Sequence, residues 1–422
     1  MAENRFLEWK GRKFGAIRSF MNRNIFITCL VLIMQSTAFG QLFSWFGSDD
    51  EPVKELLMDR KIQIETTAAI NNMYNFKFYE ADREFKWLLV KYPNHPIGHF
   101  LLGLSDWWKI VPDTGIERYD KSIHGHMDET IDLAEDMLDA NGGSKEAAFF
   151  IAAAYAFKGR LYAERENWVK SAWAGKQALK YLEKSRGDEN INPELLFGDG
   201  LYNFYSKWIH ENYKSLKPLL TFFRKGDKQL GIAQLENVSQ NAFYTRMEAR
   251  YFLVQIYAME GQNRKALRMS SMMHSIYPDN SFFHRYAARS SFALGRMQES
   301  EVFARELLDN ITAGKPGYGD NEGRYGAYIL GFIYNNYKRD KETAKFYYQK
   351  CVEFAQSNDS EDAGYSLSSL LALGNIEMDQ KNYEKAKSYF DLILDQKNRK
   401  SSSYKTAKEK SQELKKLIRK QS

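Results

Sequence analysis

The sequence predicts an all-α fold in which antiparallel helix pairs stack side by side as an α-solenoid. Apolar and small residues recur at helical spacing in paired segments, and this paired pattern returns several times along the 422 residues. Only eight prolines interrupt the chain, and no parallel-sheet pattern is visible. These observations favour one continuous helical array over two ordinary domains.

The helix pair between Arg250 and Pro278 has the plainest pattern. Its first helix should end at Gly261, and its second at Pro278, because the proline ring and its missing N–H cannot continue the backbone hydrogen bonds. The residues expected to share one face of each helix lie four or seven apart: Leu253 and Tyr257 on the first helix, Ala266 and Met273 on the second.

The last helix pair lies between Leu370 and Ile393. Gly374 falls on its first helix, and the second helix carries Ala386 and Phe390. A glycine inside a helix costs about 1 kcal/mol relative to alanine, so its presence indicates two helices that must approach closely. We expect Gly374 and Ala386 to face each other.

These positions resemble those of the tetratricopeptide repeat, a unit of about 34 residues with Leu-Gly, Tyr, Ala, Phe, Ala and Pro at set places. The resemblance extends over six roughly spaced copies, and it implies a right-handed superhelix with a concave groove that holds extended peptides. The other residues that carry it are Ala81, Phe85, Pro93, Leu102 and Gly103; Ile151, Tyr155 and Gly159; Ala287, Ala288, Gly295 and Leu307; and Leu330, Gly331 and Tyr334, followed one residue late by Ala344, Tyr348 and Cys351.

A second resemblance covers about 40 residues in the middle of the chain. Gly198 to Ile209, followed by Leu220 to Glu236, looks like the central block of the eukaryotic tetratricopeptide proteins linked to inclusion-body clearance. That block has a Gly-Leu-x-Asn helix followed by a Gly-Asp-x-x-Leu-Gly turn and helix. The resemblance implies either a specialised groove or a shared way of packing two long helices, and the second alternative is favoured.

Residues 1–40 are expected to be an N-terminal extension with a secretory signal peptide. An apolar run from Ile25 to Met34 follows a short segment that begins at Met21, and small residues precede a possible cleavage ahead of Gln41. The apolar run is shorter than the roughly 20 residues that span a bilayer, so a permanent anchor is the less favoured alternative. Whether translation starts at the first methionine or at Met21, we expect an exported product without an integral membrane span, periplasmic or cell-envelope associated.

The remaining chain divides into a short linker at 41–60, a helical repeat domain at 61–396 and a basic segment at 397–422. The first 40 residues hold six of the 60 basic and two of the 54 acidic residues. The exported chain, with 54 basic and 52 acidic residues, is therefore near neutral.

The basic segment holds the remaining charge asymmetry, with ten Lys and Arg residues opposed only by Glu409 and Glu413. Such a run could contact an anionic membrane peripherally. The favoured alternative is a helix that caps the last repeat with apolar residues at helical spacing. These are Tyr404, Ala407, Leu414, Leu417 and Ile418. Export disfavours a nucleic-acid partner.

No catalytic constellation, cofactor motif or metal site is expected. Cys351 would be the only cysteine left after removal of the signal peptide, and its place on a packing stripe indicates an inert buried thiol. Two histidine pairs are poor metal ligands, the later one because no Cys or third histidine lies at conventional spacing, and the earlier one because it straddles a helix break at Pro96. They are His95 with His99, and His124 with His126. The glycine-rich stretch from Gly314 to Gly326 matches neither a dinucleotide fingerprint nor a P-loop, and predicts a mobile loop between helices.

The resemblance to the repeat family also implies a binding surface. In that family, set positions of each first helix point into the concave groove. The residues at these positions in the better-phased units are Tyr251, Gln255, Arg285, Arg289, Tyr328, Asn335 and Asn375. Aromatic rings and guanidinium groups suit a protein or an extended peptide segment that carries carboxylates.

The sequence therefore favours an exported, non-enzymatic scaffold of tetratricopeptide type that binds another protein through its concave face. The alternative is a helical-repeat protein that captures a glycan or small ligand, motivated by four tryptophans. These are Trp107, Trp108, Trp168 and Trp173. An enzyme with an unrecognised active site is the least favoured hypothesis.

Overall fold

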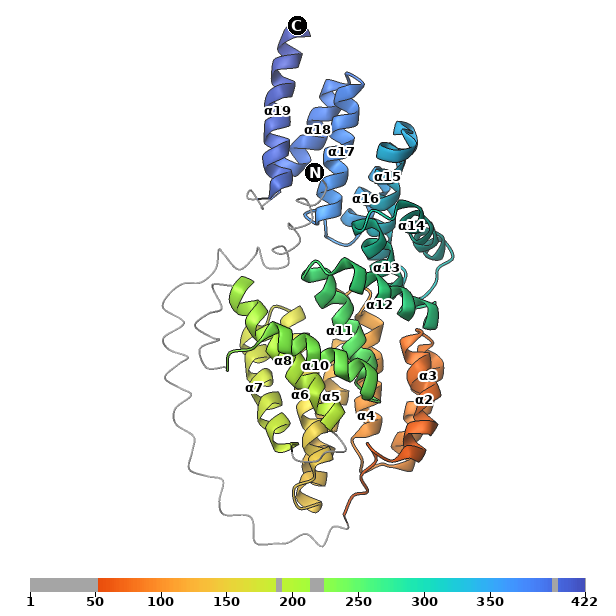
Figure 1. Cartoon of the computed structure of the whole chain (residues 1–422), viewed down its shortest axis with the longest axis vertical. Coiled ribbons are helices and arrows are strands. Elements are labelled where there is room, and N and C mark those ends of the chain that lie inside the picture. The colour runs from red at the N-terminus through yellow and green to blue at the C-terminus, as the bar shows by residue number, and fades with distance from the viewer. Residues whose placement is uncertain (1–51, 187–191, 213–223, 397–400, 422) are drawn as a thin grey trace.

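The computed structural model describes residues 52–186, 192–212, 224–396 and 401–421, and these contain 17 α-helices, one π-helical turn and no strand (Figure 1). The predicted all-α solenoid of helix pairs is confirmed. The helices are α2 (Arg60–Tyr74), α3 (Phe78–Lys91), α4 (Ile97–Ile110), α5 (Asp120–Ala140), α6 (Lys145–Glu164), α7 (Trp168–Lys184), α8 (Asn192–Asn212), α10 (Lys228–Asn241), α11 (Arg246–Met259), α12 (Asn263–Ile276), α13 (Ser281–Ala293), α14 (Met297–Thr312), α15 (Asp320–Ile333), η4 (Tyr334–Lys338), α16 (Lys341–Ser357), α17 (Gly364–Asp379), α18 (Tyr383–Leu394) and α19 (Ser402–Gln421). The expected signal peptide at 1–40 lies outside the described residues.

Helices within a pair approach closely where a first-helix glycine lies under a large side chain of the second helix. A Cβ atom at Gly374 would lie 2.4 Å from Cε1 of Phe390, and one at Gly331 would lie 2.7 Å from Cδ1 of Tyr348. The atoms nearest to Gly374 therefore belong to Phe390, where the sequence led us to expect Ala386. The aromatic ring fills the space that the missing side chain leaves.

The π-helical turn η4 explains why one repeat is out of phase by one residue. It follows α15 directly, and its backbone hydrogen bonds span five residues where those of an α-helix span four, which shifts the second helix of the pair along the sequence by one residue. Arg339 then adopts a left-handed conformation (φ 58°) that ends the turn, and Asp340 caps α16 through the backbone N–H of Thr343. The late position of Tyr348 therefore still brings its ring onto Gly331.

The described part of the expected linker, from Pro52 to Asp59, packs on the repeats. Leu56 and Leu57 are buried, and their backbone N–H groups donate to Oε1 of Glu146 at 2.8 and 2.9 Å. The same carboxylate oxygen lies 2.9 Å from Nε2 of the buried His95. A buried charge that receives several hydrogen bonds is stabilised, so this segment is fixed to the start of α6.

The central helices α8 and α10 cross at two glycines. A Cβ atom at Gly231 would lie 2.6 Å from the backbone N of Phe204, and one at Gly200 would lie 2.8 Å from Cγ of Leu235. The central block with its second resemblance thus brings two helices into backbone contact, as the favoured alternative required. The segment 213–223 between them lies outside the described residues.

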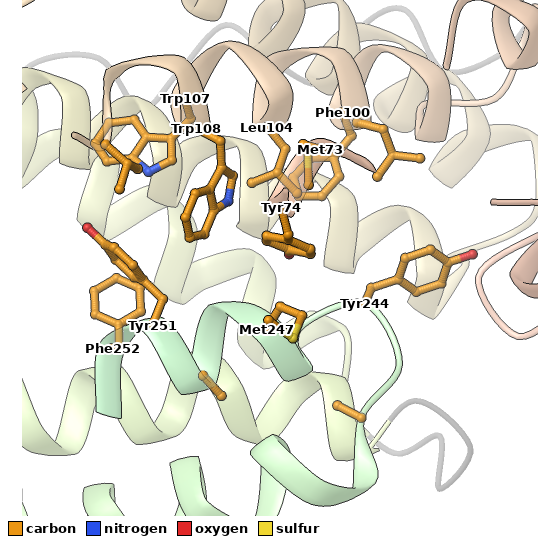
Figure 2. Close-up of a cluster of buried hydrophobic side chains, with 14 of the residues drawn as sticks. Met73, Tyr74, Phe100, Leu104, Trp107, Trp108, Tyr244, Met247, Tyr251 and Phe252 are labelled. Carbon is orange, nitrogen blue, oxygen red and sulfur yellow. The ribbon is translucent and has the colours of Figure 1, made fainter. Parts of the chain in front are cut away.

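The N-terminal helices fold back onto the middle of the chain, which an open solenoid would not do. Nε1 of Trp108 on α4 donates to Oε1 of Glu248 on α11 at 2.7 Å, and Asn280 Nδ2 donates to the carbonyl oxygen of Tyr74 at 2.7 Å. Figure 2 shows the Trp108 and Tyr74 rings turned toward the helix that carries Tyr251. One buried apolar cluster consequently runs from residue 56 to residue 286.

Beyond that cluster, the C-terminal repeats are held by three smaller apolar clusters. Helix α19 closes the array, because Ala407 and Leu414 are buried against α17 and α18. Cys351 is fully buried, and burial raises the pKa of its thiol to about 12, as expected for an inert cysteine. Within the described residues, no helix is both long enough and apolar enough to cross a membrane.

Candidate functional site

Arginine and tyrosine side chains gather on the first helices of three successive repeats, α13, α15 and α17. We call them the Arg–Tyr cluster. On α13 and α15 each member has another member three or four residues away, a spacing that places such pairs on one helix face. The cluster consists of Arg285, Tyr286, Arg289, Arg324, Tyr325, Tyr328 and Tyr365.

The tyrosines of α15 and α17 stack across the repeat boundary. The Tyr328 and Tyr365 rings lie parallel, with centroids 4.2 Å apart and planes 12° apart. Tyr325 meets Tyr365 edge to face at 4.9 Å. Such ring pairs fix side chains of few rotatable bonds, so they provide a rigid contact surface.

The arginines sit among these rings. Arg285 Nη1 donates to Oε1 of Glu322 at 2.7 Å and to the carbonyl oxygen of Pro112 at 3.0 Å, so this residue also ties α13 to the loop after α4. Arg289 is 6% exposed, and its guanidinium carbon lies 5.5 Å from the Tyr286 ring centroid. Arg324 Nη2 donates to Oδ1 of Asn321 at 3.0 Å.

The arginines of the cluster favour negative charge at Tyr325. Burial alone raises the pKa of Tyr325, but the positive charges of Arg289, Arg324 and Arg285 outweigh burial, and the pKa falls below its usual value. Burial raises the pKa of Glu322 to about 7, although Arg285 opposes that shift. A phenol that ionises more easily despite burial marks a place where negative charge is stabilised.

Three of the seven residues expected to form the groove lie in this cluster: Arg285, Arg289 and Tyr328. The other four members were missed: Tyr286, Arg324, Tyr325 and Tyr365. Tyr325 could have been found, because it lies three residues before Tyr328 on the same helix. Tyr365 comes from the first turn of α17, before the part of the helix that carries the repeat pattern.

Tyr251 and Gln255 lie at a different place, on α11. Tyr251 is only 3% exposed, its hydroxyl accepts a hydrogen bond from Arg160 Nη2 at 2.5 Å, and its ring lies 5.2 Å from that of Trp108. Gln255 Nε2 donates to the carbonyl oxygen of Tyr251 at 3.5 Å. The N-terminal helices therefore occupy the space in front of Tyr251 that the family's groove would leave open.

The two remaining groove candidates lie farther along the chain. Asn335 lies in η4 and is half-buried, with its side chain close enough to Tyr348 to lower the pKa that burial raises. Asn375 is exposed on α17. No described contact joins Asn375 to the Arg–Tyr cluster.

The tryptophans that motivated a glycan site are not together on the surface. Trp107 and Trp108 are completely buried, so neither can stack on a sugar ring, and the hypothesis is wrong for these two residues. Trp173 is 51% exposed and packs against Tyr155 at 5.5 Å. Trp168 begins α7 and is half-buried.

The other chemical candidates have structural surroundings. His95 is hydrogen-bonded at both ring nitrogens, to Glu146 and to the backbone N–H of Ile97. His124 packs on the Tyr162 ring at 4.8 Å. The glycine-rich stretch is a loop only up to Gly319, because α15 begins at Asp320; the expected longer loop is wrong, since Gly323 packs under Phe354 inside the helix.

Compared with models of protein families, the sequence matches none, and no curated protein matches it. Among solved structures, the chain is similar to the C-terminal part of a tetratricopeptide-repeat-containing protein from Cytophaga hutchinsonii, with 14% identity over 71% of this chain and 99% of that one, at a TM-score of 0.34. Yeast Tom70 (12% identity, 86% and 83% covered, TM-score 0.39) and the tetratricopeptide domain of P58(IPK) (13%, 85% and 99%, 0.23) are also similar. All three are tetratricopeptide-repeat proteins, the class that the sequence resembles. At these identities the likeness concerns the fold, and the site rests on the chain's own residues.

Proposed function

We propose that this chain is an exported, non-enzymatic scaffold of the cell envelope that binds an acidic segment of another protein at the Arg–Tyr cluster. The observation that carries the proposal is the gathering of arginines around one tyrosine: the guanidinium carbons of Arg285 and Arg324, from neighbouring repeats, lie 5.6 and 5.7 Å from the Tyr325 ring centroid. Stacked tyrosines beside those arginines supply apolar area at low entropic cost.

The chemistry favours carboxylates over other groups. A guanidinium presents two parallel N–H donors that match a carboxylate, and this match is strongest where water is partly excluded. Arg289 has the paired guanidinium donors, and water is partly excluded from it because only 6% of the residue is exposed. A partner segment with one Asp or Glu seated at Arg289 and an apolar residue against the Tyr328 and Tyr365 rings would satisfy the cluster.

The basic helix α19 supports a second, weaker contact with the envelope. Its apolar residues are covered by α17 and α18, whereas the Lys405, Lys408, Lys415 and Lys416 side chains are exposed. We propose that this face lies against anionic lipid when the scaffold is at the membrane. Each basic residue near an anionic surface contributes about 1 kcal/mol.

The proposal is tested by affinity capture from envelope extract with the chain from Gln41 onward, followed by binding measurements with the captured protein. Arg289→Gln should weaken binding roughly 10- to 100-fold, the worth of one charge-assisted hydrogen bond to a buried group. Arg268→Gln is the matched control, because Arg268 is exposed on α12. Circular dichroism of both variants checks that the fold is kept.

The captured partner then supplies the second half of the test. Changing its acidic residues to amides, one at a time, should reproduce the loss seen with Arg289→Gln, and should have no further effect in that variant. Equal binding by the native chain and Arg289→Gln would place the partner elsewhere and overturn the assignment of the cluster.

A further inference from the structure

Two histidines and a glutamate from three consecutive helices lie together away from the Arg–Tyr cluster. His274 is in the last turn of α12, His284 in the first turn of α13, and Glu306 on α14. One ligand atom from each lies within 4.8 Å of the others. His284 follows His274 by 10 residues and Glu306 follows His284 by 22, so no local sequence motif indicates the group.

The buried histidine has an unusual hydrogen-bonding state. His284 is 1% exposed, and its Nδ1 lies 3.1 Å from the hydroxyl of Tyr318. Its Nε2 makes no hydrogen bond in the described part of the chain, although Oε2 of Glu306 lies 3.6 Å away. The backbone of Phe303 also lies close enough to the ring to favour its protonated form. Buried polar atoms without a partner are rare and call for an explanation.

A second orphaned atom points to the same explanation. Nδ1 of His274 is buried and also makes no hydrogen bond among the described residues. The two imidazoles stack with centroids 4.2 Å apart, and the Phe303 ring covers both at 5.8 and 6.1 Å. Two imidazole nitrogens that make no hydrogen bond among the described residues thus lie at an apolar wall, and the 51% exposed carboxylate of Glu306 lies beside them.

We propose that His274, His284 and Glu306 bind a divalent transition-metal ion of the zinc type. Two imidazole nitrogens and one carboxylate oxygen are a ligand set that suits Zn²⁺, with water in the fourth tetrahedral position. Tyr318 is a positioning residue, because its contact with Nδ1 of His284 leaves Nε2 as the nitrogen that faces the ion. The ion would join α12 of one repeat to both helices of the next.

The protonation states agree with this role. Burial lowers the pKa of His284 to about 3 and also lowers that of His274, and a metal ion binds the neutral form of imidazole. The positive charge of Lys315 also lowers the pKa of both rings, whereas the negative charge of Asp279 raises the pKa of His274. Because Zn–N distances are about 2.0–2.1 Å, His274 must tilt out of the stack to bind, and its Nδ1 has no hydrogen bond to lose in the described part of the chain.

The test is calorimetric titration of Zn²⁺ into the full chain after treatment with a chelator and desalting. One ion per chain should bind, and His274→Gln and Glu306→Gln should each weaken binding by at least about tenfold. Tyr318→Phe should weaken Zn²⁺ binding on the order of tenfold, because it removes the hydrogen bond that holds the His284 ring in place. Glu306 is 51% exposed, so its substitution leaves the fold intact even if a histidine variant does not.

His126→Gln is the matched control, because His99 and His126 form another close histidine pair in the described part of the chain, with their Nδ1 atoms 3.3 Å apart. It should leave Zn²⁺ affinity unchanged. Titration with Co²⁺ adds a visible absorption band that reports tetrahedral coordination in the native chain and that should be lost in Glu306→Gln. Zn²⁺ binding that survives the His274, Glu306 and Tyr318 changes, or that disappears in His126→Gln, would overturn the proposal.

Discussion

Glu322 is a single carboxyl group on which burial and an ion pair act in opposite directions. It is 1% exposed, accepts a hydrogen bond from Arg285 at 2.7 Å, and also receives the N–H of Gly319 at 3.3 Å. Burial is the larger influence, and the pKa rises to about 7. The group therefore changes charge close to neutral pH, inside the candidate binding cluster.

This raised pKa predicts how stability depends on pH. Between the pKa of the unfolded chain, about 4.5, and that of the folded chain, about 7, the folded state binds more protons, so the stability contributed by Glu322 falls as pH rises. Glu322→Gln removes this dependence. The free energy of unfolding of the native chain, relative to the variant, should fall by on the order of 1–3 kcal/mol from about pH 4.5 to about pH 8. Urea unfolding across that range measures it, and parallel curves would show that Glu322 does not titrate there.

Gly374 offers a second prediction at a single residue. Alanine is ordinarily favoured over glycine inside a helix by about 1 kcal/mol, but its Cβ would lie 2.4 Å from Cε1 of the fully buried Phe390. Gly374→Ala should therefore destabilise the α17–α18 pair by about 1–3 kcal/mol. Gly364→Ala, in the same helix with no atom within 4 Å, is the control and should cause no loss. Denaturant unfolding compares the two, and equal stability would show that the ring can move aside.

The individual helices are the part of the fold that the sequence predicts best. The pair expected between Arg250 and Pro278 is present as α11 and α12, because spacing, glycine and proline are local properties. In the sequence, the extra residue of η4 appeared only as repeat positions that come one residue late, since a π-turn has no strong sequence pattern. In the candidate site, Arg289 and Tyr328 were found from repeat positions, whereas burial of Tyr251 depends on helices about 140 residues away, which no periodicity reveals.

The contact between α4 and α11 is the element-level feature that closes the N-terminal half, and it can be tested directly. Trp108→Phe keeps an aromatic ring but removes the Nε1–H donor to Glu248, whose Oε2 already makes no hydrogen bond in the described chain. Leaving the buried carboxylate less satisfied should cost about 1–3 kcal/mol of unfolding free energy. The same substitution at the 43% exposed Trp87 on α3 should be close to neutral. A small effect at both positions would mean that Glu248 is protonated or hydrated.

At the scale of the whole molecule, the chain combines a closed half with an open one. The contacts between α2–α4 and α11–α13 join residues separated by 140 to 206 positions, and the apolar cluster they share ends near residue 286. From there, each cluster involves neighbouring repeats, as in an ordinary solenoid. The Arg–Tyr cluster lies at this boundary, where Arg285 also contacts the loop after α4 through Pro112.

This arrangement predicts that a core substitution destabilises the whole closed half when it lies there, but only neighbouring helices when it lies in the open half. Leu253→Ala removes a fully buried side chain from the large cluster, should cost about 2–5 kcal/mol, and should speed amide hydrogen exchange throughout the closed half, including the distant helix α2. Leu414→Ala removes a comparable side chain from the last cluster and should speed exchange only in α17, α18 and α19. Hydrogen exchange followed by mass spectrometry resolves both patterns in the full chain. If Leu414→Ala also accelerated exchange in α2, the repeats would unfold as one cooperative unit, and the boundary near residue 286 would have no energetic meaning.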